Sequence, residues 1–279
     1  MPLARVDLES LLRTRRLDCT LTTALPPLDP RDETACAPSG VPSLDAPLGG
    51  GFPRGQLSEV VGPRSSGRTS VMLQTAAAAT GRGELVALVD VLDMFDVESA
   101  AAAGVDLDRL LWIRGHVVSN PGLCRDTNQR ALEQAIRAFT LVLQAGNFGL
   151  VIFDAAEVPA EAIRRLPFTT WLRLQRMVEG SQTMCLLVGG EPMARSSAGL
   201  TLRVGVRDSG FGIRPPSPLR AIGEPVSSEP MSSEPVSSGF RFGQQVFEGL
   251  TVDARVVRAR VREREEATAT FSTVASDCA

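Results

Sequence analysis

Residues 58–70, SEVVGPRSSGRTS, have the spacing of glycines and hydroxyl groups that is typical of a phosphate-binding loop. Gly62 and Gly67 bracket four residues, an apolar run precedes the loop, and a helical pattern follows it. In such a loop the backbone N–H groups and the positive end of the helix dipole form a cradle for phosphate. The predicted nucleotide contacts are Gly62, Pro63, Arg64, Ser65, Ser66, Gly67, Arg68, Thr69 and Ser70.

The cation of this loop is an arginine. A lysine normally meets the β- and γ-phosphates at the position of Arg68, and the hydroxyl of the next residue, here Thr69, ligates Mg²⁺. All 29 basic residues of the chain are arginine, so a general preference for arginine can account for the exchange. Arginine and lysine nevertheless differ in size, hydration and donor geometry, which makes arginine a poor substitute at a close phosphate contact.

Carboxylates at the ends of apolar strands supply the rest of the predicted chemistry. Asp154 ends the run LVIFD and is expected to hold Mg²⁺ together with Thr69, so ATP and Mg²⁺ are the predicted cofactors. Hydrolysis also needs a group that positions the attacking water. The run LVDVLDMFD offers Asp90 and Asp93 as candidate bases, but no glutamate. The pattern therefore favours nucleotide binding with weak or absent turnover over a glycine-rich turn that binds nothing.

Composition excludes several other classes of protein. The 279 residues are 43% hydrophobic, which is enough for a sizeable core, and a formal net charge of −3 gives no overall attraction to nucleic acid or anionic membranes. The five cysteines contain no CxxC pair, so neither a disulfide framework nor a metal site is indicated. The sequence begins without a signal-peptide pattern and has no apolar run of the roughly 18 residues that a membrane span needs. A soluble, cytoplasmic protein is expected.

Short apolar strands alternate with helical segments over the middle of the chain. This alternation predicts an α/β fold, in which a mostly parallel sheet is flanked by helices. After residue 200 the pattern changes to strands without helices, which predicts an antiparallel C-terminal β extension at the edge of the sheet. In the middle of the chain the expected strands lie at 56–62, 85–90, 110–115, 150–154 and 183–190, and the longest expected helix at 127–146.

These elements divide the chain into four parts. Residues 1–37 form an N-terminal arm, with a helix, a strand and a connector, and residues 38–207 form the α/β core. Residues 208–245 are a low-complexity insertion, and residues 246–279 form the C-terminal β segment. The insertion contains three copies of a five-residue unit in EPVSSEPMSSEPVSS, whose composition predicts disorder. The arm is either a mobile leader or a segment that docks on another subunit.

The core resembles the RecA recombinase. The resemblance lies in PSGVPSLDAPLGGGFPRGQLSEVVGPRSSGRTSVMLQTAAAA, continues through LVALVD, AAAGVDLDRLLW and LVIFD, and is fainter in TMCLLVGGEP and AGLTLRVGV. It covers residues 38–207 and is most specific in its first part. The fold that it implies is the RecA-type P-loop ATPase core, in agreement with the alternation of strands and helices.

Departures from the RecA pattern fall on the positions that carry its chemistry. The P-loop lysine corresponds to Arg68, the water-activating glutamate to Leu92, and the tyrosine that stacks on adenine to the region of Ser99. The segments that match the two DNA-binding loops, 156–167 and 192–199, are far shorter than in the family. Losing these groups together argues against an efficient ATPase, since removing one such group typically costs about 10²-fold or more in rate.

Reduced RecA homologues of this kind are similar to the ImuA family. That similarity implies an accessory role in the SOS response, in which such proteins support translesion synthesis together with an ImuB-like polymerase homologue or a RecA-like subunit. The alternative is a divergent RecA-type DNA-dependent ATPase or recombinase in which Asp90 or Asp93 serves as the base. A third interpretation is a structural protein whose assembly responds to bound ATP without hydrolysis. No membrane partner is expected.

Several arginines are candidates for contact with single-stranded DNA. Arg164 and Arg165 lie in the segment that matches the first DNA loop of RecA, and Arg195 lies in the match to the second. The alternative for each is a solvated surface. In the run RVVRARVRERE, residues 255–265, the alternation places several arginines on one face of a strand, where they contact DNA or an acidic partner or simply face solvent.

Overall fold

The computed structural model describes four stretches of the chain, residues 35–116, 125–206, 249–260 and 267–274. The predictions for the N-terminal helix and strand and for the repeat at 224–238 lie outside these described residues. No helix within the described stretches is both long enough and apolar enough to cross a membrane.

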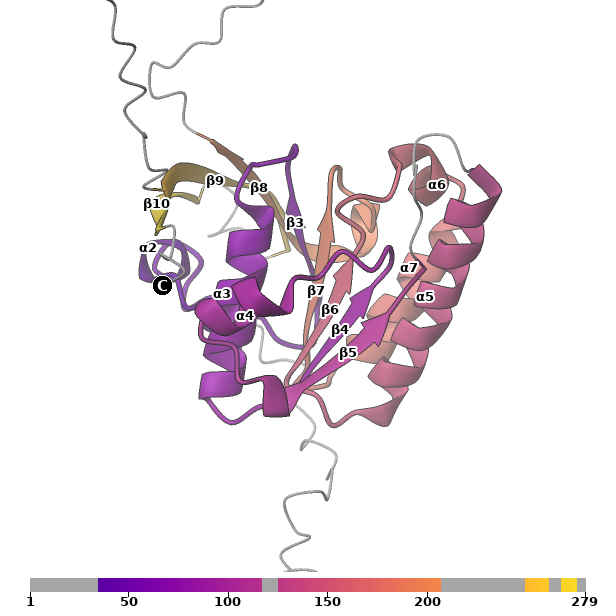
Figure 1. Cartoon of the computed structure of the whole chain (residues 1–279), viewed down its shortest axis with the longest axis horizontal. Helices are drawn as coiled ribbons and strands as arrows, with labels where there is room; N and C mark the ends of the chain where they lie inside the picture. Colours follow the sequence, from indigo (N-terminus) through magenta and orange to yellow (C-terminus); the bar gives the residue numbers. More distant parts are fainter. Residues whose placement is uncertain (1–34, 117–124, 207–248, 261–266, 275–279) are drawn as a thin grey trace, which may run out of the picture.

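The described residues form an α/β fold around one eight-stranded sheet (Figure 1). Its strand order is β10-β9-β8-β3-β7-β6-β4-β5, and the six strands from β8 to β5 are parallel to their neighbours. β9 and β10 pair antiparallel to their neighbours, as the pattern after residue 200 predicts, whereas β8, the first strand of that pattern, is parallel to β3. The strands are β3 (Leu57–Val61), β4 (Val86–Asp90), β5 (Leu110–Arg114), β6 (Leu150–Asp154), β7 (Met184–Gly189), β8 (Ala198–Val206), β9 (Gly249–Ala259) and β10 (Thr268–Val274).

Helices cover both faces of the parallel part of the sheet. α3 and α4 pack through one hydrophobic cluster, and α5 and α7 pack through a second cluster on the opposite face. Because both faces are covered, β3, β4 and β7 are buried along their whole length. β7 and the first four residues of β4 are apolar, whereas β3 carries the buried polar residues Ser58 and Glu59. The helices are α2 (Pro42–Asp45), α3 (Arg68–Gly81), α4 (Val97–Ala102), α5 (Arg125–Ala145), α6 (Ala160–Arg164) and α7 (Phe168–Val178), with short 3₁₀ turns η2 (Leu107–Arg109) and η3 (Arg195–Ser197).

A small two-stranded sheet precedes the core. It pairs β1 (Cys36–Ala37) with β2 (Phe52–Pro53), and α2 lies between these two strands in the chain. Phe52 and Leu44 from this region are fully buried against the same cluster as α3. The sequence between the predicted arm and the first core strand therefore belongs to the folded core.

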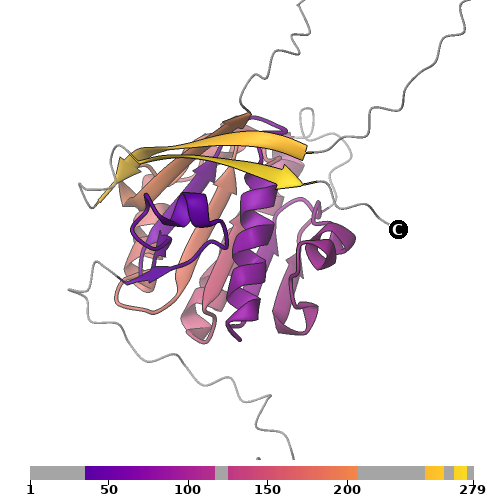
Figure 2. The ribbon, with the colours of Figure 1, turned by 90° about the vertical axis from the view of Figure 1, so that its left-hand side faces the viewer.

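The last two strands lie beside the N-terminal end of α3. Figure 2 shows β9 and β10 crossing the molecule above this end of the helix. Val252 of β9 is fully buried, and a Cβ atom placed on Gly67 would lie only 2.6 Å from its Cγ2 atom. The glycine at the start of α3 is thus required by close packing of a strand that lies far away in the sequence.

Candidate nucleotide site and arginine-lined cavity

The predicted phosphate loop connects β3 to α3 and has the backbone shape of an anion cradle. Ser65 and Gly67 adopt positive φ angles of 57° and 90°, and helical geometry follows at once. Alternation of right- and left-handed residues turns successive N–H groups toward one concavity, which favours an anion. Gly62 is also fixed sterically, because a Cβ atom there would lie 2.3 Å from the Val204 carbonyl oxygen.

One buried hydroxyl of the loop has no partner inside the protein. The Ser66 side chain is 1% exposed, and its Oγ atom forms no hydrogen bond with any described residue. A buried polar atom without a partner costs free energy. An incoming anion or its solvent shell would satisfy this hydroxyl, so Ser66 fits a ligand-binding loop.

Arg68 does not extend freely into the cradle. Its Nη1 atom donates a 3.1 Å hydrogen bond to the Ala156 carbonyl oxygen, and its Nη2 atom lies 3.4 Å from Glu157 Oε1. The side chain is buried, and both of its partners belong to the segment that follows β6. Glu157 also forms an ion pair with Arg64, so the two arginines of the loop share one carboxylate. Sequence reasoning missed Glu157, because no local pattern connects it to the loop.

Thr69 and Asp154 are the residues that the sequence predicts as ligands of Mg²⁺. Thr69 is exposed at the start of α3, and Asp154 ends β6 with its Oδ1 atom accepting a 2.9 Å hydrogen bond from Ala156 N–H. A hydroxyl and one carboxylate suit Mg²⁺ that arrives with nucleotide phosphates and keeps its remaining waters. Among the described residues there is no group of three or more acidic, histidine or cysteine side chains that would hold a metal unaided.

The pKa of Asp154 is raised to about 6. Burial is the largest cause, and the charge of Asp90 adds to it, because the two residues are paired across β4 and β6. The hydrogen bond from Ala156 N–H and the charge of Arg68 act in the opposite direction. A bound cation would therefore relieve an unfavourable negative charge here.

The two candidate bases have partners of their own. Asp90 is buried, and its Oδ2 atom accepts hydrogen bonds from Phe95 N–H at 2.8 Å and from the Trp112 indole at 3.4 Å. Asp93 accepts two 2.8 Å hydrogen bonds from Arg114, which lower the pKa of its carboxyl group. Both carboxylates are thus engaged in holding the loop after β4 to the neighbouring strand β5.

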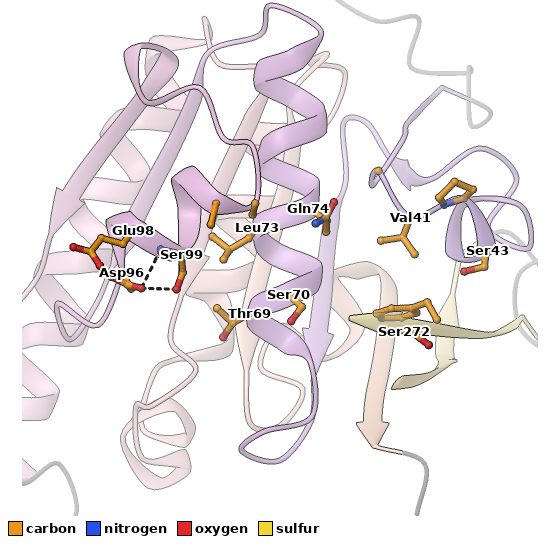
Figure 3. A pocket seen from close by; sticks show the side chains of 15 residues that line it. Val41, Ser43, Thr69, Ser70, Leu73, Gln74, Asp96, Glu98, Ser99 and Ser272 are labelled. Atoms are coloured by element: carbon orange, nitrogen blue, oxygen red, sulfur yellow. Dashed lines mark hydrogen bonds between the residues drawn. The ribbon is translucent and has the colours of Figure 1, made fainter. Parts of the chain in front are cut away.

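A cavity of about 820 Å³ opens beside the first turns of α3 (Figure 3). Thr69 and Ser70 line it from the P-loop side, and Asp96 and Ser99 line it from α4, where the Asp96 carboxylate accepts a hydrogen bond from Ser99 N–H. Its volume falls within the range of small-molecule sites. Phe271 of β10 supplies an aromatic side chain to this cavity, which sequence reasoning missed because it lies some two hundred residues beyond the P-loop.

A second cavity, of about 560 Å³, brings together two of the three predicted DNA contacts. Arg164 and Arg195 both line it, together with Arg203 of β8, which sequence reasoning missed. Arg164 forms a 2.6 Å ion pair with Glu191, another lining residue. Arg165 does not line the cavity and instead pairs with Glu161 at 3.0 Å on the same short segment.

Further arginines extend from this cavity over the outer strands. Arg203 of β8 lies directly opposite Arg255 of β9, and both side chains are exposed. Arg258 lies opposite Thr201, and Arg258 and Arg260 are exposed whereas Ala259 between them is buried. The prediction that several arginines share one strand face is confirmed over residues 255–260; the rest of that run lies outside the described residues.

Comparison with known proteins relates the core to RecA. The sequence model of the RecA N-terminal domain matches residues 28–165. Protein RecA of Salinispora tropica is 42% identical over 134 residues, which are 47% of this chain and 34% of that protein. Protein RecA of Clavibacter michiganensis is 37% identical over 165 residues, 58% of this chain and 41% of that protein. Protein RecA of Acholeplasma laidlawii is 40% identical over 129 residues, which are 45% of this chain and 35% of that protein.

The region matched by the RecA N-terminal domain contains the P-loop, the strands from β3 to β6 and all of α6, and it stops before the arginine-rich outer strands. The alignments with the three RecA proteins span between a third and about two fifths of the length of those proteins. Both the sequence match and the sheet with its flanking helices therefore place a RecA-like core in this chain.

Proposed function

We propose that this chain is a RecA-like accessory protein of DNA repair, similar to the ImuA type, which binds nucleotide without efficient hydrolysis. The observation that carries the proposal is the position of Arg68. Its guanidinium group donates to Ala156 and Glu157 instead of projecting freely into the cradle where a lysine would meet phosphate. Because Arg68 is already paired within the protein, the loop is better suited to binding a nucleotide through its backbone N–H groups than to catalysing hydrolysis.

Three features support retained binding of ATP. The loop has the backbone geometry of an anion cradle, Ser66 keeps an unpaired buried hydroxyl, and a cavity of suitable size lies beside the first turn of α3. Thr69 and Asp154 are the expected ligands of the accompanying Mg²⁺. Phe271 provides an aromatic face for a base, in place of the tyrosine that the RecA pattern has near Ser99.

The groups that would drive hydrolysis are missing or occupied. Leu92, at the position of the RecA glutamate, is a buried apolar side chain. Asp90 and Asp93, which the alternative ATPase hypothesis would use as bases, hold the loop after β4. Lowering the pKa of Asp93 also weakens it as a proton acceptor.

We infer that single-stranded DNA is held by the arginines around the second cavity and on the outer strands. Arg164, Arg195 and Arg203 converge on that cavity, and Arg255 continues the row. Like charges directly opposite each other, as in the Arg203–Arg255 pair, are unfavourable unless an anion neutralises them. Phosphate groups of a nucleic acid are the anions that the proposed role in repair supplies.

The proposed biological setting is the cytoplasmic SOS response. In that setting the chain would support translesion synthesis or recombination through an ImuB-like polymerase homologue or a RecA-like subunit. The chain spans less than half of the RecA proteins that it matches, so recombinase activity is not assumed for it.

The direct test measures ATP binding and phosphate release with and without single-stranded DNA. ATP with Mg²⁺ should raise the melting temperature, because a ligand that binds only the folded state stabilises it. Phosphate release should remain at the level of the Asp154→Asn variant, and an ImuB-like protein should be retained in a pull-down. DNA-stimulated phosphate release that Asp154→Asn abolishes would instead establish the divergent ATPase.

A further inference from the structure

One charged cluster joins the P-loop to the segment that carries the predicted DNA contacts. Glu157 lies three residues after Asp154, and its two carboxylate oxygens are divided between Arg64 and Arg68. The Arg68 side chain is 6% exposed and that of Glu157 22%, whereas that of Arg64 is 81% exposed. The Glu157 carboxylate therefore bridges the exposed Arg64 and the buried Arg68 of the P-loop.

We propose that Glu157 is an internal anion that occupies the two P-loop arginines until a nucleotide phosphate replaces it, and that its release alters the segment carrying Arg164. The inference rests on the proposed function, since it assumes that the cradle binds nucleotide. It goes beyond that function by proposing that Glu157 regulates nucleotide binding, which neither the RecA resemblance nor the loop motif implies.

The same donor geometry accepts a carboxylate or a phosphate. A guanidinium fork binds either group through charge-assisted hydrogen bonds, so Glu157 and an incoming phosphate compete for the same N–H donors. A phosphate bound at the cradle would also repel the carboxylate, because both are negative. The protein thus has two states, one with Glu157 paired with the arginines and one with Glu157 released. Nucleotide shifts the equilibrium toward the released state by the ratio of its affinities for the two states.

The structure links this movement to the second cavity. α6 begins at Ala160, three residues after Glu157, and ends at Arg164. Arg164 lines the cavity and pairs with Glu191 across it, and Pro63 of the P-loop lines the same cavity. The segment after β6 therefore touches the nucleotide cradle at one end and the arginine-lined cavity at the other. By linkage, a polyanion bound at the cavity should change the affinity for ATP by the same factor as ATP changes the affinity for that polyanion.

The test compares ATP–Mg²⁺ affinity in the full chain and in two carboxylate variants, with circular dichroism to confirm folding. Glu157→Gln removes the competing charge and should tighten ATP binding about fivefold, the range expected for one partly exposed ion pair. Glu161→Gln is the matched control, because Glu161 pairs with Arg165 in the same segment and not with the P-loop. It should leave the affinity unchanged. In an Arg64→Gln background the gain from Glu157→Gln should be smaller, because half of the pairing is already absent.

Each outcome is decisive. Equal affinity of the wild-type and Glu157→Gln proteins overturns the proposed competition and leaves nucleotide binding intact. Weaker ATP binding by Glu157→Gln overturns it too, because Glu157 would then help to hold the ligand. An equal gain in affinity in Glu161→Gln also overturns it, because the gain would then come from removing any negative charge in this segment. Absence of ATP binding in every folded variant overturns nucleotide binding as well. As a second readout, backbone hydrogen exchange over residues 155–166 should increase on addition of ATP in the wild type and should not change in Glu157→Gln.

Discussion

Arg68 shows how one substitution redirects a side chain within an otherwise intact loop. Lysine carries a compact ammonium group that reaches a phosphate as a point charge, whereas the planar fork of arginine fits a carbonyl and a carboxylate. In this chain the fork is placed on Ala156 and Glu157. The loop thus has the backbone geometry of an anion cradle, while the side chain at the position of the RecA lysine contacts the segment that follows β6.

Changing Arg68 to lysine separates the structural and ligand-binding roles of this position. Arg68→Lys should lower the free energy of unfolding by about 1–2 kcal/mol, since it loses hydrogen bonds to Ala156 and Glu157. ATP–Mg²⁺ affinity should rise in calorimetric titration, while phosphate release stays low because Leu92 positions no water. Arg165→Lys, in an exposed pair with Glu161, is the control and should change neither quantity. Unchanged ATP affinity in Arg68→Lys would count against the assigned role.

The pH dependence of stability should report on Asp154. Its pKa in the folded protein is about 6, above the ordinary value of 3.8, so the native state binds a proton more tightly than the unfolded state. The resulting stabilisation is fully present below about pH 4 and is lost as the pH rises through 6. Denaturant unfolding of Asp154→Asn should lack this loss, so that the variant gains stability relative to the wild type at pH 7.5 but not at pH 4. A parallel pH profile for the two proteins would contradict the assignment.

The proposed nucleotide site depends on strands outside the loop itself. β9 places Val252 against Gly67, and β10 places Phe271 in the cavity beside α3. β6 carries Asp154 and leads into the segment of Glu157. The site is therefore assembled by the order of strands in the sheet.

Contact between β9 and the P-loop can be tested with two valines of the same strand. Val252→Ala should destabilise the protein by about 2 kcal/mol, because it removes buried methyl groups and leaves a cavity over Gly67. It should also weaken ATP binding, since the start of α3 loses its packing. Val257→Ala is the control, because Val257 is 51% exposed, and it should change stability by less than about 0.5 kcal/mol. Equal effects in chemical denaturation would show that the contact does not matter.

Local patterns were sufficient to predict most of the core elements. The strand expected at 150–154 is β6 residue for residue, and those expected at 85–90 and 110–115 differ from β4 and β5 by one residue. The helix expected at 127–146 is α5 within two residues. The strands are short apolar runs and α5 is a long amphipathic helix, so the signal of each lies within a short window of sequence.

Contacts between distant segments were not predictable in the same way. Glu157 pairs with arginines some ninety residues away, and Phe271 reaches a cavity beside a helix two hundred residues earlier. The hydrogen bonds that join Asp90 to Phe95 and Asp93 to Arg114 are equally invisible in the run LVDVLDMFD. Such contacts depend on strand order, which apolar periodicity does not specify.

At the scale of the whole molecule, charge is distributed unevenly although the net charge is only −3. Arg164, Arg195 and Arg203 surround one cavity, and Arg255 and Arg258 continue onto the outer strands. A protein with little net charge can still bind a polyanion through such a local surface. The proposed DNA contact thus depends on the position of these arginines, not on the overall composition.

Salt dependence of DNA binding should identify these contacts. Arg203→Gln should weaken binding to single-stranded DNA similarly for all sequences and reduce the slope of log affinity against log salt by about 0.7, the change for one phosphate contact on a single strand. Arg109→Gln, near the opposite edge of the sheet and paired with Asp106, should leave both quantities unchanged. Fluorescence anisotropy at several salt concentrations measures them, and an unchanged slope in Arg203→Gln would remove this arginine from the proposed surface.

The packing of Val252 on Gly67 has a consequence for how this chain can be dissected. The match to the RecA N-terminal domain ends at residue 165, yet the P-loop glycine Gly67 is packed against a strand that starts at Gly249. A truncated fragment that stops at Val206 would keep every residue of the loop motif and lose the wall that packs against it. Removing the last quarter of the polypeptide therefore changes the packing around the proposed nucleotide pocket. Nucleotide binding measured on such a fragment would not represent the binding of the full chain.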